Sequence, residues 1–172
     1  MIIGLSGKMG SGKSTLANHI ISTSNKAVTV KIAGILYDIQ DMIYTKLNMT
    51  LEGEKDRPLL IAVGMWGRDK DQDFWCKKAL DQAQILSSQS NIVIIDDIRF
   101  PNEALAVQNA GGLLIRIEGT QRGPNLTPEA LTSTTETALD EFDFEYTINN
   151  QVSQEQVFEQ YTFISEQFKH RR

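Results

Sequence analysis

The chain has 172 residues, a formal net charge of −5 and a pI of about 5.1, so its length suits one compact α/β domain and excludes two full ones. An acidic chain has no basic field for duplex DNA or an anionic membrane, which excludes a nucleic acid polymer and a membrane as expected partners. The single cysteine, Cys76, excludes an intramolecular disulfide, and we find no signal peptide and no apolar run of membrane-spanning length. We therefore expect a reducing, cytoplasmic setting.

The N-terminal stretch contains a complete phosphate-binding pattern, G-x-x-x-x-G-K-[ST], at residues 7–14. Apolar residues at 1–5 predict a buried strand before it, and the apolar spacing at 15–21 predicts a helix after it. Glycines let successive backbone N–H groups turn toward a phosphate chain, and the helix start adds further unpaired N–H groups. In this pattern Lys13 reaches the β- and γ-phosphates and the Ser14 hydroxyl ligates Mg²⁺. The expected nucleotide-binding residues are Gly7, Gly10, Ser11, Gly12, Lys13, Ser14 and Thr15.

Strand and helix patterns alternate along the rest of the chain. Further strands are expected at 28–33, 91–97, 113–117 and 144–148, and helices at 35–47, 74–88, 102–110 and 152–168. The segment 48–73 is rich in glycine and charge, so we expect a mobile, substrate-facing connection with a short helix at 58–63. The alternation predicts an α/β fold of the P-loop NTPase type, with a doubly wound, parallel five-stranded sheet and helices on both faces.

Two acidic residues and an arginine follow the strongest predicted strand. The apolar run at 92–95 leads directly into Asp96 and Asp97, and Arg99 comes two residues later. Ligands of open parallel sheets bind at the carboxyl ends of the strands, so these side chains are expected to face the phosphate-binding loop. One of the two carboxylates is expected to hold Mg²⁺, directly or through water. The planar guanidinium of Arg99 suits a bidentate phosphate contact, and a surface ion pair with Glu103 is the alternative.

Four further stretches carry a more specific pattern than the loop alone. They are residues 2–7 leading into the loop, D-I-R-F-P-N-E-A at 97–104, Gly111-Gly112 before I-R-I at 115–117, and T-E-T-A-L-D at 135–140 before Y-T-I-N-N at 146–150. Together they resemble the deoxynucleoside monophosphate kinases of bacteriophages, over most of the chain.

The resemblance implies an enzyme that transfers the γ-phosphate of ATP to a deoxynucleoside monophosphate (dNMP), giving dNDP and ADP, with ATP and Mg²⁺ as cofactors. It implies one kinase domain over residues 1–172, with an acceptor-binding segment at about 34–75 and a closing lid at about 118–136. For a viral enzyme of this kind the setting would be the host cytoplasm.

The same resemblance assigns roles to individual side chains. Asp97 matches the acid of the family block and is preferred to Asp96 as the metal-linked or acceptor-orienting carboxylate, and Arg99 would hold the acceptor phosphate. Arg57 and Arg68 resemble positions of the acceptor region that clamp the phosphate or the base, with solvated loop charges as the alternative. The Ala-Asp-x-Leu-Lys-like segment of the family reads A-G-I-L-Y at 33–37 here, without its acid and lysine.

Two further expectations concern the lid and the base. Arg116 and Arg122 bracket the expected lid, and Arg122 is the preferred catalytic arginine because it lies within the stretch rich in Gly, Thr, Ser and Pro. Trp66 lies in the acceptor-facing half and is a candidate to stack on a nucleobase, with core packing as the alternative.

Other functions share the phosphate-binding loop. A kinase for another small acceptor, such as a sugar acid or a coenzyme precursor, would differ mainly in residues 33–75. A non-catalytic ATP-binding module would bind nucleotide without transfer, and the arginines that face the phosphates argue against it. A GTP switch is disfavoured because the chain has no Asn-Lys-x-Asp tetrapeptide and no Asp-x-x-Gly after the central strand. The sequence leaves open which base is accepted and whether the chain forms a homodimer.

Overall fold

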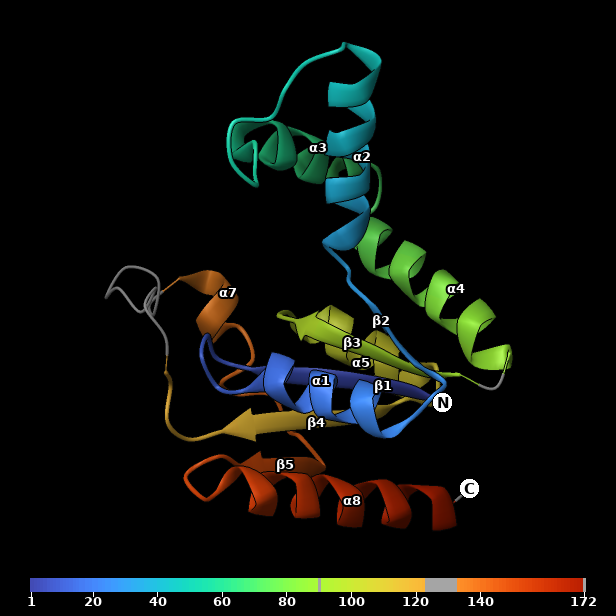
Figure 1. Ribbon diagram of the computed structural model, residues 1–172, viewed down its shortest axis with the longest axis vertical. Helices are drawn as coiled ribbons and strands as arrows, with labels where there is room; N and C mark the ends of the chain where they lie inside the picture. The colour runs from blue at the N-terminus through green and yellow to red at the C-terminus, as the bar shows by residue number, and fades with distance from the viewer. Residues whose placement is uncertain (90, 123–132, 172) are drawn as a thin grey trace.

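A five-stranded parallel sheet lies at the centre of the computed structural model, which describes residues 1–89, 91–122 and 133–171 (Figure 1). The strands are β1 (Ile2–Gly7), β2 (Ala27–Val30), β3 (Ile92–Ile98), β4 (Leu113–Glu118) and β5 (Tyr146–Asn149). They lie in the order β2-β3-β1-β4-β5, and every neighbouring pair is parallel. The predicted fold class is confirmed, and all five strands end at the same edge of the sheet.

Helices cover both faces of the sheet (Figure 1). The helices of the described residues are α1 (Lys13–Thr23), α2 (Gly34–Lys46), α3 (Arg57–Lys70), α4 (Phe74–Ser88), α5 (Pro101–Asn109), α7 (Thr134–Thr137) and α8 (Gln154–His170), and of these α2 and α3 do not cover the sheet. Successive side chains of a strand point to opposite faces. Ile94 therefore packs in one apolar core with residues of α1 and α8, and its neighbours Val93 and Ile95 pack in a second core with residues of α4 and α5. Within the described ranges, none of the helices combines the length and the apolar character that a membrane crossing requires.

Helix α3 is longer than the sequence indicates. We expected a connection over 48–73 with a short helix at 58–63, and the structure has a continuous helix of 14 residues. Asp56 caps it by accepting a hydrogen bond from the Leu59 amide (3.0 Å). Its glycines make room for a neighbour: a Cβ on Gly67 would lie 2.4 Å from Nε1 of Trp75, and the same Nε1 donates to the Gly64 carbonyl (3.0 Å). These glycines therefore mark a close helix contact and not a loop.

Helices α2 and α3 project away from the sheet (Figure 1). Polar contacts fix the connection between them: the Asp56 amide donates to Oε1 of the buried Gln40 (2.8 Å), and the Tyr44 hydroxyl donates to the Asp56 carboxylate (2.8 Å). The two helices thus form a braced pair that lies apart from the phosphate-binding loop.

Candidate active site

The phosphate-binding loop joins β1 to α1 in a conformation that depends on glycine. Gly10 and Gly12 have φ of 73° and 97°, in the left-handed region that other residues avoid. A Cβ on Gly10 would lie 2.1 Å from the Arg122 carbonyl oxygen, so this position also requires glycine for space. A Cβ on Gly12 would meet no protein atom within 4 Å, because Gly12 faces the open side of the loop. The loop therefore has the open cradle that a phosphate chain needs.

Lys13 lies inside this loop. Its amine donates to the carbonyl oxygens of Gly7 (2.6 Å) and Lys8 (2.9 Å). Burial, and secondarily the neighbouring positive charge of Arg99, lower the pKa of the Lys13 amine to about 8. Two backbone carbonyls thus direct the Lys13 amine toward the loop interior, where it can donate hydrogen bonds to a phosphate chain.

A cavity of about 710 Å³ opens from the loop toward the carboxyl ends of the strands. Of the predicted nucleotide-binding residues, all except Gly7 line it, and so do Asp96, Asp97, Arg99 and Arg122. The remaining lining residues include Met9, Lys31, Thr120, Asn150, Val152 and Phe158. The fold therefore brings the loop, both carboxylates and two of the predicted arginines around one space.

The two neighbouring aspartates have different surroundings. Both carboxylate oxygens of Asp97 accept backbone hydrogen bonds, from the amides of Ile32 and Ala33 (3.0 Å each). Burial raises the pKa of the Asp97 carboxyl, and these two hydrogen bonds oppose that shift. Asp96 is also buried, but its Oδ1 has no hydrogen-bond partner and lies 3.9 Å from Nζ of Lys31.

The sequence-based preference for Asp97 as the metal-linked or acceptor-orienting carboxylate stays a prediction, and the geometry gives Asp97 a second, structural role. Its carboxylate fixes the end of β2 to β3, which also explains why β2 ends at Val30 and does not continue to the expected residue 33. The oxygen that is buried and available belongs to Asp96. Ser14, on the first turn of α1, borders the same cavity and is exposed. A hydroxyl, one carboxylate, phosphate oxygens and water suit Mg²⁺, which favours oxygen ligands. Within the described part of the chain, no group of three His, Cys, Asp or Glu side chains is placed to hold a metal ion.

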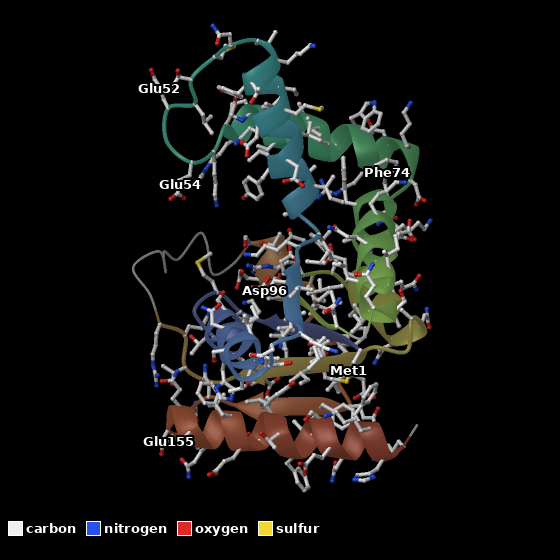
Figure 2. The ribbon with its side chains drawn as sticks, turned by 45° about the vertical axis from the view of Figure 1, so that its right-hand side comes forward. Met1, Glu52, Glu54, Phe74, Asp96 and Glu155 are labelled. Carbon is white, nitrogen blue, oxygen red and sulfur yellow. The ribbon has the colours of Figure 1, made fainter. Side chains whose placement is uncertain are left out.

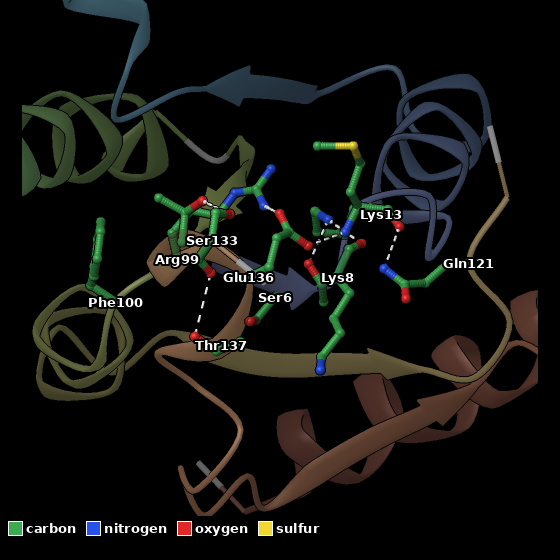
Figure 3. Close-up of polar contacts among 12 residues, drawn as sticks. Ser6, Lys8, Lys13, Arg99, Phe100, Gln121, Ser133, Glu136 and Thr137 are labelled. Atoms are coloured by element: carbon green, nitrogen blue, oxygen red, sulfur yellow. Dashed lines mark hydrogen bonds and ion pairs between the residues drawn. The ribbon is translucent and has the colours of Figure 1, made fainter. Parts of the chain in front are cut away.

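Arg99 pairs with an acid that the sequence did not assign to it. The alternative considered was Glu103, but Glu103 accepts from the backbone amides of Arg99 (2.7 Å) and Phe100 (3.0 Å) at the start of α5. The Arg99 guanidinium instead pairs with Glu136 of α7, and the same carboxylate accepts a hydrogen bond from the Met9 amide in the loop (Figure 3). Arg99 is therefore held beside the loop by a buried acid.

Arg116 has a structural position. It is buried on β4, donates to Ser6 Oγ (3.1 Å) and Asp140 (3.2 Å), and lies over the Phe144 ring (5.5 Å). Asp140 also pairs with Lys8 of the loop (2.9 Å). Because its guanidinium is enclosed by these partners, the expectation that Arg116 could swing in with a lid is wrong.

The segments after β4 and β5 contact the loop directly. The Gln121 side chain donates to the Met9 carbonyl (3.0 Å), the Arg122 amide donates to the Gly10 carbonyl (3.0 Å), and the Asn150 side chain donates to the Ser11 carbonyl (2.7 Å). Of the expected lid at 118–136, residues 123–132 lie outside the described residues. Its described ends therefore belong to the support of the loop, and Arg122 stays a candidate at the cavity.

The remaining predicted substrate residues lie on α3. Arg57, Trp66 and Arg68 do not line the cavity at the loop. Arg57 borders a separate hollow of about 560 Å³ near the α2–α3 connection, and Trp66 is 55% exposed with its ring edge-on to Phe74. Figure 2 shows the same separation, with Glu52 and Glu54 of that connection far from Asp96. The roles of Arg57, Trp66 and Arg68 as acceptor contacts stay predictions.

Sequence reasoning assigned no role to Lys31, Gln121 or Asn150, which the structure places at the site. Lys31 and Asn150 each follow a strand directly, after β2 and β5, and the rule that ligands bind at carboxyl ends of strands could have selected them. Gln121 contacts the loop across more than 100 residues of chain, so no local pattern indicates it.

For Glu136, the Thr135-Glu136 pair resembles a Ser-Glu pair of the kinase family whose acid contacts the lid or the substrate, with a helix cap as the alternative. The structure places this acid against Arg99 and the Met9 amide.

Solved structures with this fold are P-loop kinases of small molecules. Dephospho-CoA kinase from Campylobacter jejuni matches with a TM-score of 0.58 and 19% identity, covering 99% of this chain and 98% of that one. Shikimate kinase from Aquifex aeolicus matches with a TM-score of 0.51 and 16% identity, covering 97% of each chain. A gluconokinase from Sinorhizobium meliloti matches with a TM-score of 0.50 and 14% identity, covering 98% of this chain and 93% of that one. The chain therefore has the P-loop kinase fold, and at these identities the likeness shows the fold alone.

One curated relative is closer in sequence. The chain is 34% identical over 145 residues to the uncharacterized protein ORF77 of Ictalurid herpesvirus 1 (strain Auburn), which covers 81% of this chain. The chain spans 59% of the length of that relative. No family model matches the chain.

Proposed function

We propose that the protein is a kinase that transfers the γ-phosphate of ATP to a deoxynucleoside monophosphate, within a single domain over residues 1–172. The observation that carries this proposal is that the phosphate-binding loop, Asp96 and Arg99 line one and the same cavity. A binding-only module has no need of a second cationic group opposite the loop. The P-loop kinase fold supports phosphoryl transfer in general, and the resemblance of the sequence to bacteriophage dNMP kinases supports the choice of acceptor.

The residues of the cavity divide into a donor side and an acceptor side. Loop amides and Lys13 bind the β- and γ-phosphates of ATP, and Arg99 binds the phosphate of the acceptor. Phosphoryl transfer has a loose transition state, so alignment of donor and acceptor and positive charge around the moving group supply most of the catalysis. An ionised phosphate acceptor requires no general base. Arg122, at the described end of the expected lid, adds a third positive charge.

Ser14 and Asp96 fit the role of metal ligands. The Ser14 hydroxyl and the unpartnered Oδ1 of Asp96 are oxygen donors that border the same cavity. When bound with ATP, Mg²⁺ neutralises charge on the phosphate oxygens. Asp97 borders the same cavity and keeps the end of β2 in place through its two backbone hydrogen bonds.

Release of ADP from Mg-ATP in the presence of each dNMP and NMP in turn tests this proposal, with shikimate, gluconate and dephospho-CoA as acceptors that are not nucleoside monophosphates. We expect stimulation by one or a few dNMPs and a loss of at least about 100-fold in K13A and R99A, the scale at which removal of one transition-state contact acts. The exposed Lys169→Ala on α8 is the matched control for the loss of one positive charge. Stimulation only by an acceptor that is not a nucleoside monophosphate would redirect the assignment to another small-molecule kinase. Tight ATP binding without any acceptor effect would reject transfer.

A further inference from the structure

Glu136 is a buried acid that joins two parts of the candidate site. Its side chain is 1% exposed, and it lies on the short helix α7. It pairs with the Arg99 guanidinium and accepts a hydrogen bond from the Met9 amide (Figure 3). A buried carboxylate is costly unless it is paired, so these two contacts are needed to keep it in place.

The two partners of Glu136 both border the cavity, whereas Glu136 is not among the lining residues that the described chain provides. Arg99 keeps a side chain that is 30% exposed. A guanidinium has five N–H donors, so pairing at Nη1 leaves donors for a phosphate. Met9 is next to Gly10 in the turn of the loop. Glu136 therefore lies behind the site, where it can orient Arg99 without contacting a ligand.

We propose that Glu136 is a positioning residue for phosphoryl transfer, which holds the Arg99 guanidinium at a fixed place relative to the phosphate-binding loop. The inference rests on the proposed function, in which Arg99 binds the acceptor phosphate. Without this acid, Arg99 would be a flexible side chain near other cations, and ordering it during the reaction would cost rotamer entropy. Because Arg99 is already oriented before the acceptor binds, its orientation lowers the barrier to transfer more than it strengthens ATP binding.

The chain provides a matched control in Asp140. This acid also connects the segment that follows α7 to the loop, but its partners are Lys8 and Arg116, neither of which lines the cavity. D140N therefore removes a contact to the loop without touching Arg99, from an acid that is 34% exposed whereas Glu136 is 1% exposed. If the role of Glu136 were only structural, E136Q, like D140N, would lower turnover only as far as it lowers the free energy of unfolding.

The first arm of the test measures turnover with the dNMP identified by the acceptor screen, in wild type, E136Q, E136D, R99A and the E136Q/R99A double variant. Loss of a charge-assisted hydrogen bond predicts that E136Q lowers kcat by about 10- to 100-fold. KM for Mg-ATP should change by less than about threefold, because Lys13 and the loop amides bind ATP. E136D should recover part of kcat, and the double variant should be no worse than R99A. Independent, multiplicative losses, or equal losses in D140N, would overturn the proposal.

The second arm observes Arg99 directly and needs no acceptor. In protein labelled with ¹⁵N-arginine, restricted rotation should give the Arg99 guanidinium resolved Nη signals, assigned by their absence in R99K. We expect E136Q to collapse them and D140N to leave them unchanged. Unchanged signals in E136Q would reject the positioning role. If no acceptor is ever phosphorylated, the proposed function fails in the first arm, and this second arm still decides whether Glu136 holds Arg99.

Discussion

At the scale of single residues, the two aspartates at the end of β3 differ in what their oxygens do. Asp97 uses both oxygens for backbone amides of residues 32 and 33, whereas Asp96 keeps Oδ1 without a hydrogen-bond partner. A buried acceptor without a partner costs stability, and such a cost is typical of functional sites. Asp96 is thus suited to a ligand, and Asp97 to the support of the strand ends.

This division predicts opposite effects of two conservative substitutions. D96N should lower Mg-ATP-dependent turnover by about 100-fold or more. It should change the free energy of unfolding little, because the protein contact that it weakens is a 3.9 Å ion pair with the exposed Lys31, and such pairs contribute little. D97N should lower the free energy of unfolding by about 1–3 kcal/mol, since an amide nitrogen cannot accept from the Ile32 or Ala33 N–H. Urea unfolding and turnover, measured on D96N and D97N, check this prediction. Equal losses in the free energy of unfolding would contradict the separate roles of the two aspartates.

Glu103 gives the molecule a stability that depends on pH. Burial, reinforced by the nearby Asp97 carboxylate and opposed by two backbone hydrogen bonds, raises the pKa of Glu103 to about 7 from 4.5. Because the folded pKa is the higher one, its contribution to stability is fully present below pH 4.5 and is lost as pH rises through about 7. The free energy of unfolding of wild type relative to E103Q should therefore fall over this window, by at most about 3 kcal/mol.

Urea unfolding at several pH values, followed by tryptophan fluorescence, measures that difference. The exposed Glu159→Gln on α8 controls for the loss of one negative charge. A difference between wild type and E103Q that stays constant from pH 4.5 to 7.5 would show that Glu103 is not buried as described.

At the scale of elements, the contact between α3 and α4 depends on how Trp75 fits against two glycines. The Trp75 indole donates to the Gly64 carbonyl, and its ring occupies the space that a Cβ on Gly67 would need. A Cβ on Gly64 would meet Nη1 of Arg68 at 3.4 Å and Cδ1 of Leu36 at 3.8 Å, both at the ends of side chains and at ordinary contact distances. The two glycines of one helix therefore have different tolerance for a methyl group.

Alanine substitutions separate the two positions. G67A should destabilise the protein by about 1–3 kcal/mol, because the methyl group displaces the indole from a packed contact. G64A should be neutral or stabilising by up to about 1 kcal/mol, because alanine favours the helix. Thermal or urea unfolding of both variants gives the comparison. A G67A protein as stable as G64A would show that α3 does not pack against Trp75 in this way.

At the scale of the whole molecule, the regular alternation of strand and helix patterns was sufficient to predict the sheet. Buried parallel strands and amphipathic helices each have an apolar pattern that can be recognised within a short stretch of sequence. The phosphate-binding loop was predictable for the same reason. The prediction was wrong at α3, because its glycines indicated a loop, whereas in the structure they allow a close contact with Trp75 of α4. It also could not reveal that Glu136 holds Arg99, or that Asp97 binds the backbone after β2, because those contacts join residues 37 and 65 positions apart. The support of the site, unlike its loop, is a property of the fold.

The central claim is that one cavity aligns ATP with a nucleotide acceptor. Its most direct test follows the labelled γ-phosphate of Mg-ATP and asks where the label goes when a dNMP is present. The account predicts labelled dNDP formed in equal amount to ADP, at a rate that falls in R99A while Mg-ATP binding is retained. Label found only in inorganic phosphate, or in no product at all, would contradict transfer to a nucleotide.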